Sequence, residues 1–238
     1  HNTLELLFEP YLKKNILVQD LKSMDKKITS ILTIQFREYL SKEDLMTGNN
    51  LLTFEVAKQY VKNFLELEIK NVLQAQNRKL DYRILSQENK INFIVPVQVA
   101  DKKINVKIEG FADRIGLYGS QVQLVDYKTG SVSSADLSFK SWSELAENSK
   151  KSKALQLALY GYIYLMQNPE IDDSVSGIYS FRNLQPGLLQ LKCNRKKVTA
   201  KDIRENFPQV IEIVVQNMLS TSSVFKHNLE AKYCNYCS

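Results

Sequence analysis

Residues 121–130, QVQLVDYKTG, form a strand-like stretch that ends in charged residues and a turn. Apolar residues recur with a period near two before the run stops at a Thr-Gly pair, which is the pattern of a β-strand. Because alternate residues of a strand share a face, Asp126 and Lys128 should point to one side and Tyr127 to the other. The sequence therefore predicts two opposite charges side by side at the rim of a sheet.

Two earlier stretches have the same period-two pattern, INFIVPVQVA at 91–100 and INVKIEGFADRIGLYG at 104–119. The short turns between the three stretches favour an antiparallel meander. In that arrangement, Asp113 comes close to Asp126 on the neighbouring strand.

Two neighbouring carboxylates repel each other, so both stay ionised only with a cation between them. An oxygen-rich site of this kind favours Mg²⁺ or Mn²⁺. A metal held by Asp113, Asp126 and a backbone carbonyl could polarise a phosphate and lower the pKa of a bound water. Lys128 would hold that water or neutralise the charge that develops on the phosphate. The alternative is that Asp126 and Lys128 form an exposed ion pair without function.

The rest of the chain contains helical patterns and one further strand pair. Helical spacing of apolar residues covers 4–17, 51–76, 153–167 and 199–220, the last interrupted or started near Pro208. Two more strands are expected at 174–182 and 187–194. This order of elements predicts a mixed α/β or α+β domain.

The composition of the 238 residues, 44% apolar and 24% charged, is typical of an ordinary globular protein. No run of about 18 apolar residues and no secretory leader is found, which favours a cytoplasmic protein without a membrane span. The net charge of +6 fits a nucleic-acid partner, although many proteins of that charge bind none. The chain begins without methionine and ends one residue after YCNYC, which suggests a piece of a longer polypeptide.

Three short motifs occur in order along the chain: GFADRIG at 110–116, VDYKTG at 125–130 and QLALYGY at 156–162. Together they resemble the RecB-type nuclease domain of the PD-(D/E)XK nuclease superfamily, and in particular the C-terminal domain of AddB-like helicase-nuclease subunits. The resemblance implies a restriction-endonuclease-like core with a central mixed sheet flanked by helices. Extra N-terminal helices over residues 1–85 would pack on this core, which would cover 86–238.

The resemblance also implies roles for individual residues. Asp113, Asp126 and Lys128 would be catalytic, and both aspartates would bind the metal together with the carbonyl of Tyr127. Three motif residues would bind DNA or support the site: Arg114, Gln156 and Tyr160. The same role is expected of Lys150, Lys151 and Lys153, which form a basic run before the third motif.

The sequence departs from the family pattern in one metal ligand. RecB-type domains commonly place a histidine on a helix before the sheet, and the only histidines here, His1 and His227, are not expected on that helix. Glu88, just before the predicted first strand, is the expected replacement. Glu66 and Glu68 are better interpreted as a solvated helix face.

The second departure concerns the cysteines. Several RecB-type nucleases hold an iron-sulfur cluster with one upstream cysteine and a C-terminal group that begins Cys-x-x-Cys. Cys234 and Cys237 resemble the start of that group, and only Cys193 remains to assist. Since such clusters usually need four thiolates, we expect no complete cluster in this chain, although Cys234 and Cys237 could be ligands in a longer protein.

The resulting hypothesis is a Mg²⁺- or Mn²⁺-dependent deoxyribonuclease, an exonuclease on single-stranded ends that works with a helicase subunit or helicase domain in DNA repair and recombination. One alternative is a catalytically idle DNA-binding module of such a complex. Another is a stand-alone phage or CRISPR-associated nuclease.

Overall fold

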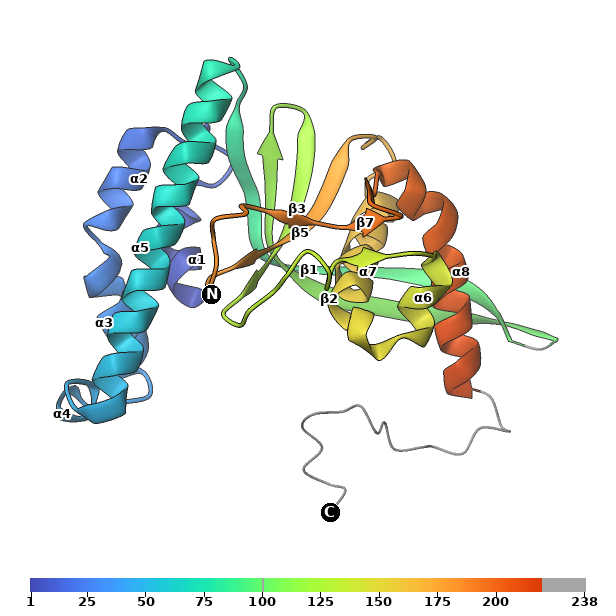
Figure 1. Cartoon of the computed structure of the whole chain (residues 1–238), viewed down its shortest axis with the longest axis horizontal. Coiled ribbons are helices and arrows are strands. Elements are labelled where there is room, and N and C mark those ends of the chain that lie inside the picture. Colours follow the sequence, from blue (N-terminus) through green and yellow to red (C-terminus); the bar gives the residue numbers. More distant parts are fainter. Residues whose placement is uncertain (100, 220–238) are drawn as a thin grey trace.

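The computed structural model describes residues 1–99 and 101–219, and it has three layers. A group of N-terminal helices lies on one side of a central sheet, and a second group of helices lies on the other side (Figure 1). The first group comprises α1 (Asn2–Phe8), α2 (Val18–Asp25), α3 (Ile28–Arg37), α4 (Lys42–Leu45) and α5 (Gly48–Asn77), with a short 3₁₀ turn at Glu9–Tyr11. The second group comprises α6 (Trp142–Glu147), a 3₁₀ turn at Ser149–Lys151, α7 (Ser152–Gln167) and α8 (Ala200–Leu219).

The central sheet has five strands in the order β1-β2-β3-β5-β6. Their bounds are β1 (Tyr82–Val99), β2 (Lys102–Tyr118), β3 (Gln121–Lys128), β5 (Ser174–Ser180) and β6 (Leu189–Gln190). The first three strands form the expected antiparallel meander. The sheet becomes mixed because β5 returns parallel to β3 after the α6–α7 segment. A small second sheet joins β4 (Ser138–Phe139), β7 (Lys192–Cys193) and β8 (Lys196–Lys197).

This mixed sheet between helices confirms the predicted fold class, with two differences in the elements. β1 begins at Tyr82, before the predicted 91, because polar residues at 86–90 hide its alternation. α8 runs through Pro208 instead of starting there. It begins where Thr199 and Asp202 cap one another, with each side chain accepting a hydrogen bond from the backbone N–H of the other.

α5 is the long helix that covers one face of the sheet. Its buried residues recur every three or four positions and face the neighbouring helices and the sheet. They are Phe54, Val61, Phe64, Leu65, Glu68, Val72 and Ala75. The Phe64 ring meets the rings of Tyr127 and Tyr179 edge-on, with centroids 5.3 Å apart in each pair. The α5 layer therefore packs directly on β3 and β5, and α7 and α8 enclose the opposite core.

Candidate metal centre

Three acidic residues lie side by side on three neighbouring strands. Arg114 pairs with Val125, so Asp113 of β2 stands beside Asp126 of β3. On the other side, β1 pairs with β2 at Gln87–Arg114 and again at Asn89–Ala112, which sets Glu88 beside Asp113. The meander thus brings together the carboxylates that the sequence analysis singled out.

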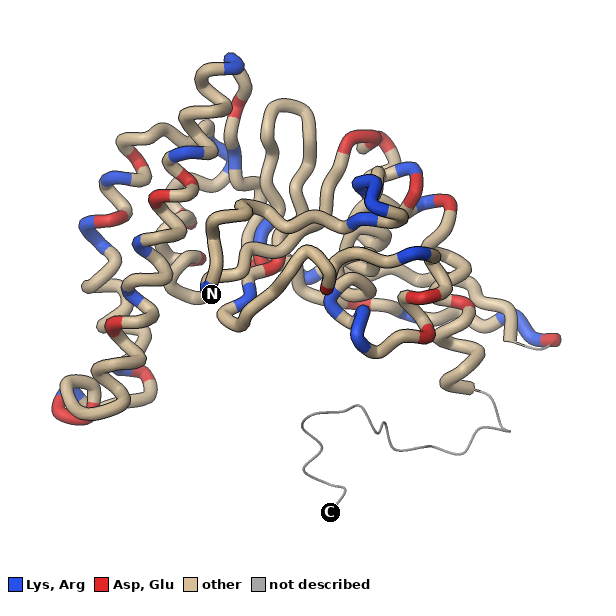
Figure 2. The backbone as a smooth tube through the Cα atoms, in the orientation of Figure 1, with Lys and Arg blue, Asp and Glu red and all other residues tan. Residues whose placement is uncertain are grey.

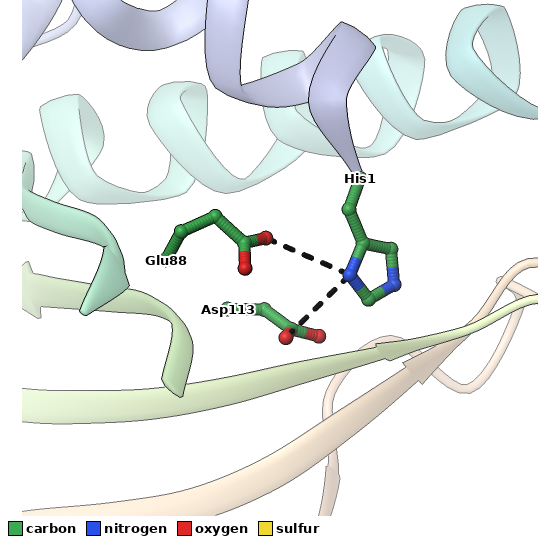
Figure 3. Close-up of side chains that lie close together, drawn as sticks. All are labelled: His1, Glu88 and Asp113. Atoms are coloured by element: carbon green, nitrogen blue, oxygen red, sulfur yellow. Dashed lines mark ion pairs between the residues drawn. The ribbon is translucent and has the colours of Figure 1, made fainter. Parts of the chain in front are cut away.

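His1 completes this group, although it was not expected on the helix that carries the family's histidine. It is the residue before α1, and its Nδ1 lies 3.6 Å from Oε1 of Glu88 and 3.5 Å from Oδ1 of Asp113 (Figure 3). The ligand atoms of His1, Glu88 and Asp113 all lie within 4.8 Å of one another. The sequence analysis did not predict this contact, because it spans more than 80 residues of chain and no local pattern reveals it.

The second nitrogen of the His1 ring contacts the backbone of β3. Nε2 lies 3.1 Å from the carbonyl oxygen of Tyr127, which can accept its hydrogen bond. A metal-binding histidine usually donates its other ring N–H to a carbonyl or carboxylate, and this fixes its tautomer. The Tyr127 carbonyl, predicted as a metal ligand, therefore contacts His1 in this structure.

Burial of these carboxylates disfavours their ionised form. Asp113 is 8% exposed and Asp126 is 2% exposed. Burial raises the pKa of Asp113 to about 6, with the nearby Glu88 carboxylate adding to the effect. Burial also raises the pKa of Asp126, and Asp113 adds to it. For Glu88, burial and then Glu5 raise the pKa. A group of acids held against its own repulsion is the environment that a divalent cation stabilises.

Lys128 is held beside Asp126. Its Nζ lies 3.0 Å from Oδ1 and 2.9 Å from Oδ2 of that carboxylate. The Lys128 side chain is one-third exposed whereas Asp126 is buried, so the ammonium stands between the carboxylate and solvent. As expected, the two side chains share a face, and Tyr127 points the other way into the α5 core.

The backbone around the acids is irregular. Glu88 has a φ of +43°, which side-chain-bearing residues rarely adopt, and the β1–β2 register shifts by one residue between Ile84 and Ser86. On β2, Ala112 and Ile115 pack in the same core cluster, although residues three apart in a regular strand face opposite sides. Bulges and strained residues of this kind gather at functional sites, where they redirect side chains.

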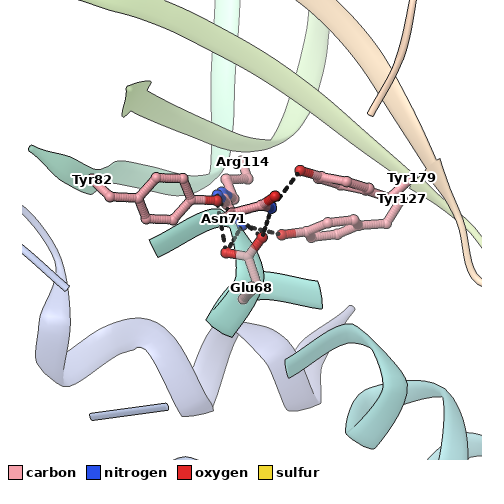
Figure 4. Close-up of polar contacts among 6 residues, drawn as sticks. All are labelled: Glu68, Asn71, Tyr82, Arg114, Tyr127 and Tyr179. Carbon is pink, nitrogen blue, oxygen red and sulfur yellow. Dashed lines mark hydrogen bonds and ion pairs between the residues drawn. The ribbon is translucent and has the colours of Figure 1, made fainter. Parts of the chain in front are cut away.

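Arg114, which was predicted to bind DNA or to support the site, lies beneath the site and is fully buried. Its Nη1 donates to Oε2 of Glu68 at 2.8 Å, and its Nη2 donates to the Tyr82 hydroxyl at 2.6 Å (Figure 4). The Tyr82 hydroxyl in turn donates to Glu68. The other role considered for Arg114, site support, fits this network.

The burial of Glu68 contradicts the prediction for it. Glu68 was expected on a solvated helix face, but its side chain is 0% exposed. Burial is the largest influence on the pKa of Arg114 and lowers it, but the Glu68 carboxylate and the nearby tyrosine hydroxyls together outweigh burial, so the pKa rises. A buried charge needs such a partner and further hydrogen bonds. Asn71 supplies one by donating to Oε1 of Glu68 at 3.1 Å and to the Tyr179 hydroxyl at 3.2 Å. The sequence signal that could have predicted this burial is the place of Glu68 among the apolar positions of α5.

Tyr127 connects this network to the metal centre. Its hydroxyl accepts from Arg114 at 3.4 Å, and burial raises its pKa to about 12, so it stays protonated. Its backbone N–H donates to Oδ2 of Asp113 at 2.6 Å, and its carbonyl faces His1. One residue therefore fixes the positions of an acid and a histidine through its backbone while its ring is anchored by α5.

The third motif packs on the first. A Cβ added at Gly110 would lie 2.4 Å from the Tyr160 ring, so only glycine allows α7 to approach β2 this closely. Gln156 donates to the Tyr160 hydroxyl at 2.8 Å. Gly110, Gln156 and Tyr160 therefore form one contact between α7 and β2, which explains their joint occurrence in the sequence.

The predicted phosphate-binding lysines occupy the entry to α7. Lys151 Nζ donates to the carbonyls of Ala135 and Ser138 at 2.9 and 2.6 Å, so it holds the loop after β3. Lys153 lies 3.6 Å from Asp136, and Lys150 is exposed. DNA contact by these lysines stays a prediction. Cys234 and Cys237 lie outside the described residues, so the cluster hypothesis is not addressed.

The sheet carries a row of carboxylates on three neighbouring strands, with a lysine two residues beyond the last acid. The family model of the PD-(D/E)XK nuclease superfamily matches residues 1–238, and the chain belongs to that superfamily. Membership implies hydrolysis of nucleic-acid phosphodiesters. A comparison with curated proteins finds no match. None of the helices within residues 1–99 and 101–219 combines the length and apolar content needed to cross a membrane.

The donor set fits a divalent metal ion. Glu88 and Asp113, with Asp126 beside them, offer carboxylate oxygens, which suit Mg²⁺ or Mn²⁺. His1 adds an imidazole nitrogen, a donor that transition-metal ions prefer. When bound, such an ion supplies Lewis acidity to a phosphate oxygen. The chain itself would supply the ammonium of Lys128 for developing negative charge, and the Tyr127 carbonyl would orient His1.

Proposed function

We propose that this chain is a metal-dependent deoxyribonuclease that degrades single-stranded ends and acts within a helicase-nuclease assembly in DNA repair. The convergence of His1, Glu88 and Asp113 within 4.8 Å, beside Asp126 and Lys128, is the observation that carries the proposal. The resemblance to AddB-like subunits supports the helicase partner and the exonuclease mode. The idle-site alternative was motivated by the missing helix histidine. The position of His1 beside Glu88 and Asp113 supports an active site instead.

The experiment is a cleavage assay on end-labelled single-stranded DNA, duplex DNA and RNA with Mg²⁺ or Mn²⁺. The parent should shorten single-stranded DNA from an end only when metal is present. Lys128→Ala should lower kcat by about 100-fold or more, because it removes a charge that stabilises the transition state. Asp126→Ala should abolish cleavage.

A matched control is Lys103→Ala, which removes an exposed lysine on the β1–β2 hairpin. It should cut at the parent rate. If the parent leaves every substrate intact with either metal, the nuclease proposal fails. Preferential cutting of RNA or of internal duplex sites would replace the proposed substrate or mode.

A further inference from the structure

A polar groove lies between α5 and the chain that follows β5, on the face of the sheet away from α7. It consists of two adjoining cavities with volumes of about 630 and 320 Å³. Asn71 and Gln74 of α5 line both cavities, so the two adjoin at these residues. The far wall of the larger cavity is the segment 181–187.

The groove is basic. Lys70, Arg78, Arg182 and Lys197 line it, and all four are exposed. Within residues 1–99 and 101–219, none of the four side chains has an ion-pair partner, and Glu66 is the one acidic residue on the walls. Figure 2 shows Lys and Arg on α5 and on the β7–β8 segment, and Arg78 and Lys197 from these two elements line the smaller cavity. Unpaired cations facing a shared space favour a polyanion.

Amide side chains supply the rest of the polar lining. They are Asn63, Asn71, Gln74, Asn183 and Gln185 in the larger cavity and Gln121, Gln123 and Gln190 in the smaller one. Oε1 of Gln190 is buried without a hydrogen-bond partner. Amides donate to phosphate oxygens and pair with the exposed edges of unpaired bases. A duplex hides those base edges, so this lining favours a single strand.

The groove begins at the catalytic strand end. The backbone N–H of Phe181 donates to the carbonyl of Lys128 at 2.9 Å, and Arg182 follows directly in the groove wall. The other end reaches Gln121 and Gln123 at the start of β3. The groove therefore follows the length of β3, which spans about 25 Å for an eight-residue strand.

We propose that this groove binds a single nucleic-acid strand, with its phosphates on the four cations, as that strand enters or leaves the edge of the sheet that carries Lys128. This inference rests on the proposed nuclease function for its biological meaning, but the binding itself can be measured without catalysis. It adds a binding surface on α5 and the 181–187 segment to the lysines near α7.

The test compares the parent with a triple variant, Lys70→Ala, Arg78→Ala and Arg182→Ala. The matched control removes three exposed lysines outside the groove, Lys26→Ala, Lys27→Ala and Lys102→Ala, for the same change in charge. Fluorescence anisotropy with a labelled 20-nucleotide single strand in EDTA gives affinity without cleavage. The groove variant should bind at least about tenfold more weakly, and its salt slope should fall by about 2, at about 0.7 per lost phosphate contact.

A second readout separates binding from chemistry. The groove variant should hydrolyse thymidine 5′-(p-nitrophenyl) phosphate at the parent rate, because that substrate is too short to fill the groove. Loss of oligonucleotide affinity in the groove variant alone supports the proposal, even if the parent cuts nothing and the nuclease function fails. Equal affinities for the parent and the groove variant would overturn the groove proposal while leaving the nuclease function intact. Equal competition by duplex DNA or by polyglutamate would also overturn it.

Discussion

At the scale of single residues, the burial of Asp113 places a carboxylate at the metal centre and lowers the stability of the metal-free fold. It is buried between two other acids, and its pKa of about 6 lies well above the ordinary value of 3.8. A raised folded-state pKa means that the native chain holds this proton more tightly than the unfolded chain does. The ionised form therefore destabilises the metal-free fold above pH 6.

Asp113→Asn should therefore stabilise the metal-free protein at pH 7.5, by up to about 3 kcal/mol at 1.36 kcal/mol per pKa unit. The asparagine carbonyl can still accept the hydrogen bond from Tyr127 N–H. The gain should shrink as the pH falls from 6 toward 4 and vanish below about pH 3.8, where the aspartate is protonated in the unfolded state as well as in the native state. Urea unfolding in EDTA at several pH values measures it. Asp101→Asn, at an exposed position, should show no such trend.

His1 belongs to the same scale. His1→Ala removes a nitrogen from the group with Glu88 and Asp113, and it should weaken Mn²⁺ binding by about tenfold or more. Isothermal titration calorimetry measures this without a substrate. Asn2→Ala, at the neighbouring position, should keep the parent affinity. An unchanged affinity in His1→Ala would show that the imidazole does not bind the ion.

At the scale of elements, a buried ion pair joins α5 to β2 and orients β3. Glu68 and Arg114 are both inaccessible to solvent, and the guanidinium also contacts the hydroxyl of Tyr127. Tyr127 in turn holds Asp113 and His1 by its backbone. Tyr127 thus links the α5 layer to the metal centre.

Breaking this pair should be costly. Glu68→Gln leaves the Arg114 charge buried without a countercharge, and we expect a loss of about 3–5 kcal/mol in the free energy of unfolding. The double variant Glu68→Gln with Arg114→Met should recover part of that loss, since no lone charge remains. Denaturant unfolding of the two single variants and the double variant forms the cycle. Additive losses would show that the pair is not coupled.

At the scale of the whole molecule, one sheet is shared by two helical layers. The α5 layer packs on Tyr127 and Tyr179, and the α7 and α8 layer packs on Ile178 of the same strands. Trp142, the only tryptophan, lies in the second layer, where its ring contacts Phe139 and Phe207.

This arrangement predicts one cooperative unfolding transition. Trp142 fluorescence reports the α6–α8 layer, whereas far-UV circular dichroism reports the helices of both layers, including the long helix α5. Because both layers depend on the same strands, the two signals should give the same urea midpoint. Two separate midpoints would mean that residues 1–85 unfold independently of the core.

The sequence by itself determined the strand that ends in Asp126 and Lys128, the meander that brings Asp113 beside it, and the mixed α/β class. These follow from period-two alternation and short turns, which act between residues that are close along the chain. Only the tertiary structure decided the roles of His1, Glu68 and Arg114. Glu68 and Arg114 are 46 residues apart, and His1 is 126 residues from Tyr127. A polar residue is buried or solvated according to what packs against it. The groove along α5 has the same origin, because its walls are brought together by the packing of a helix on a sheet.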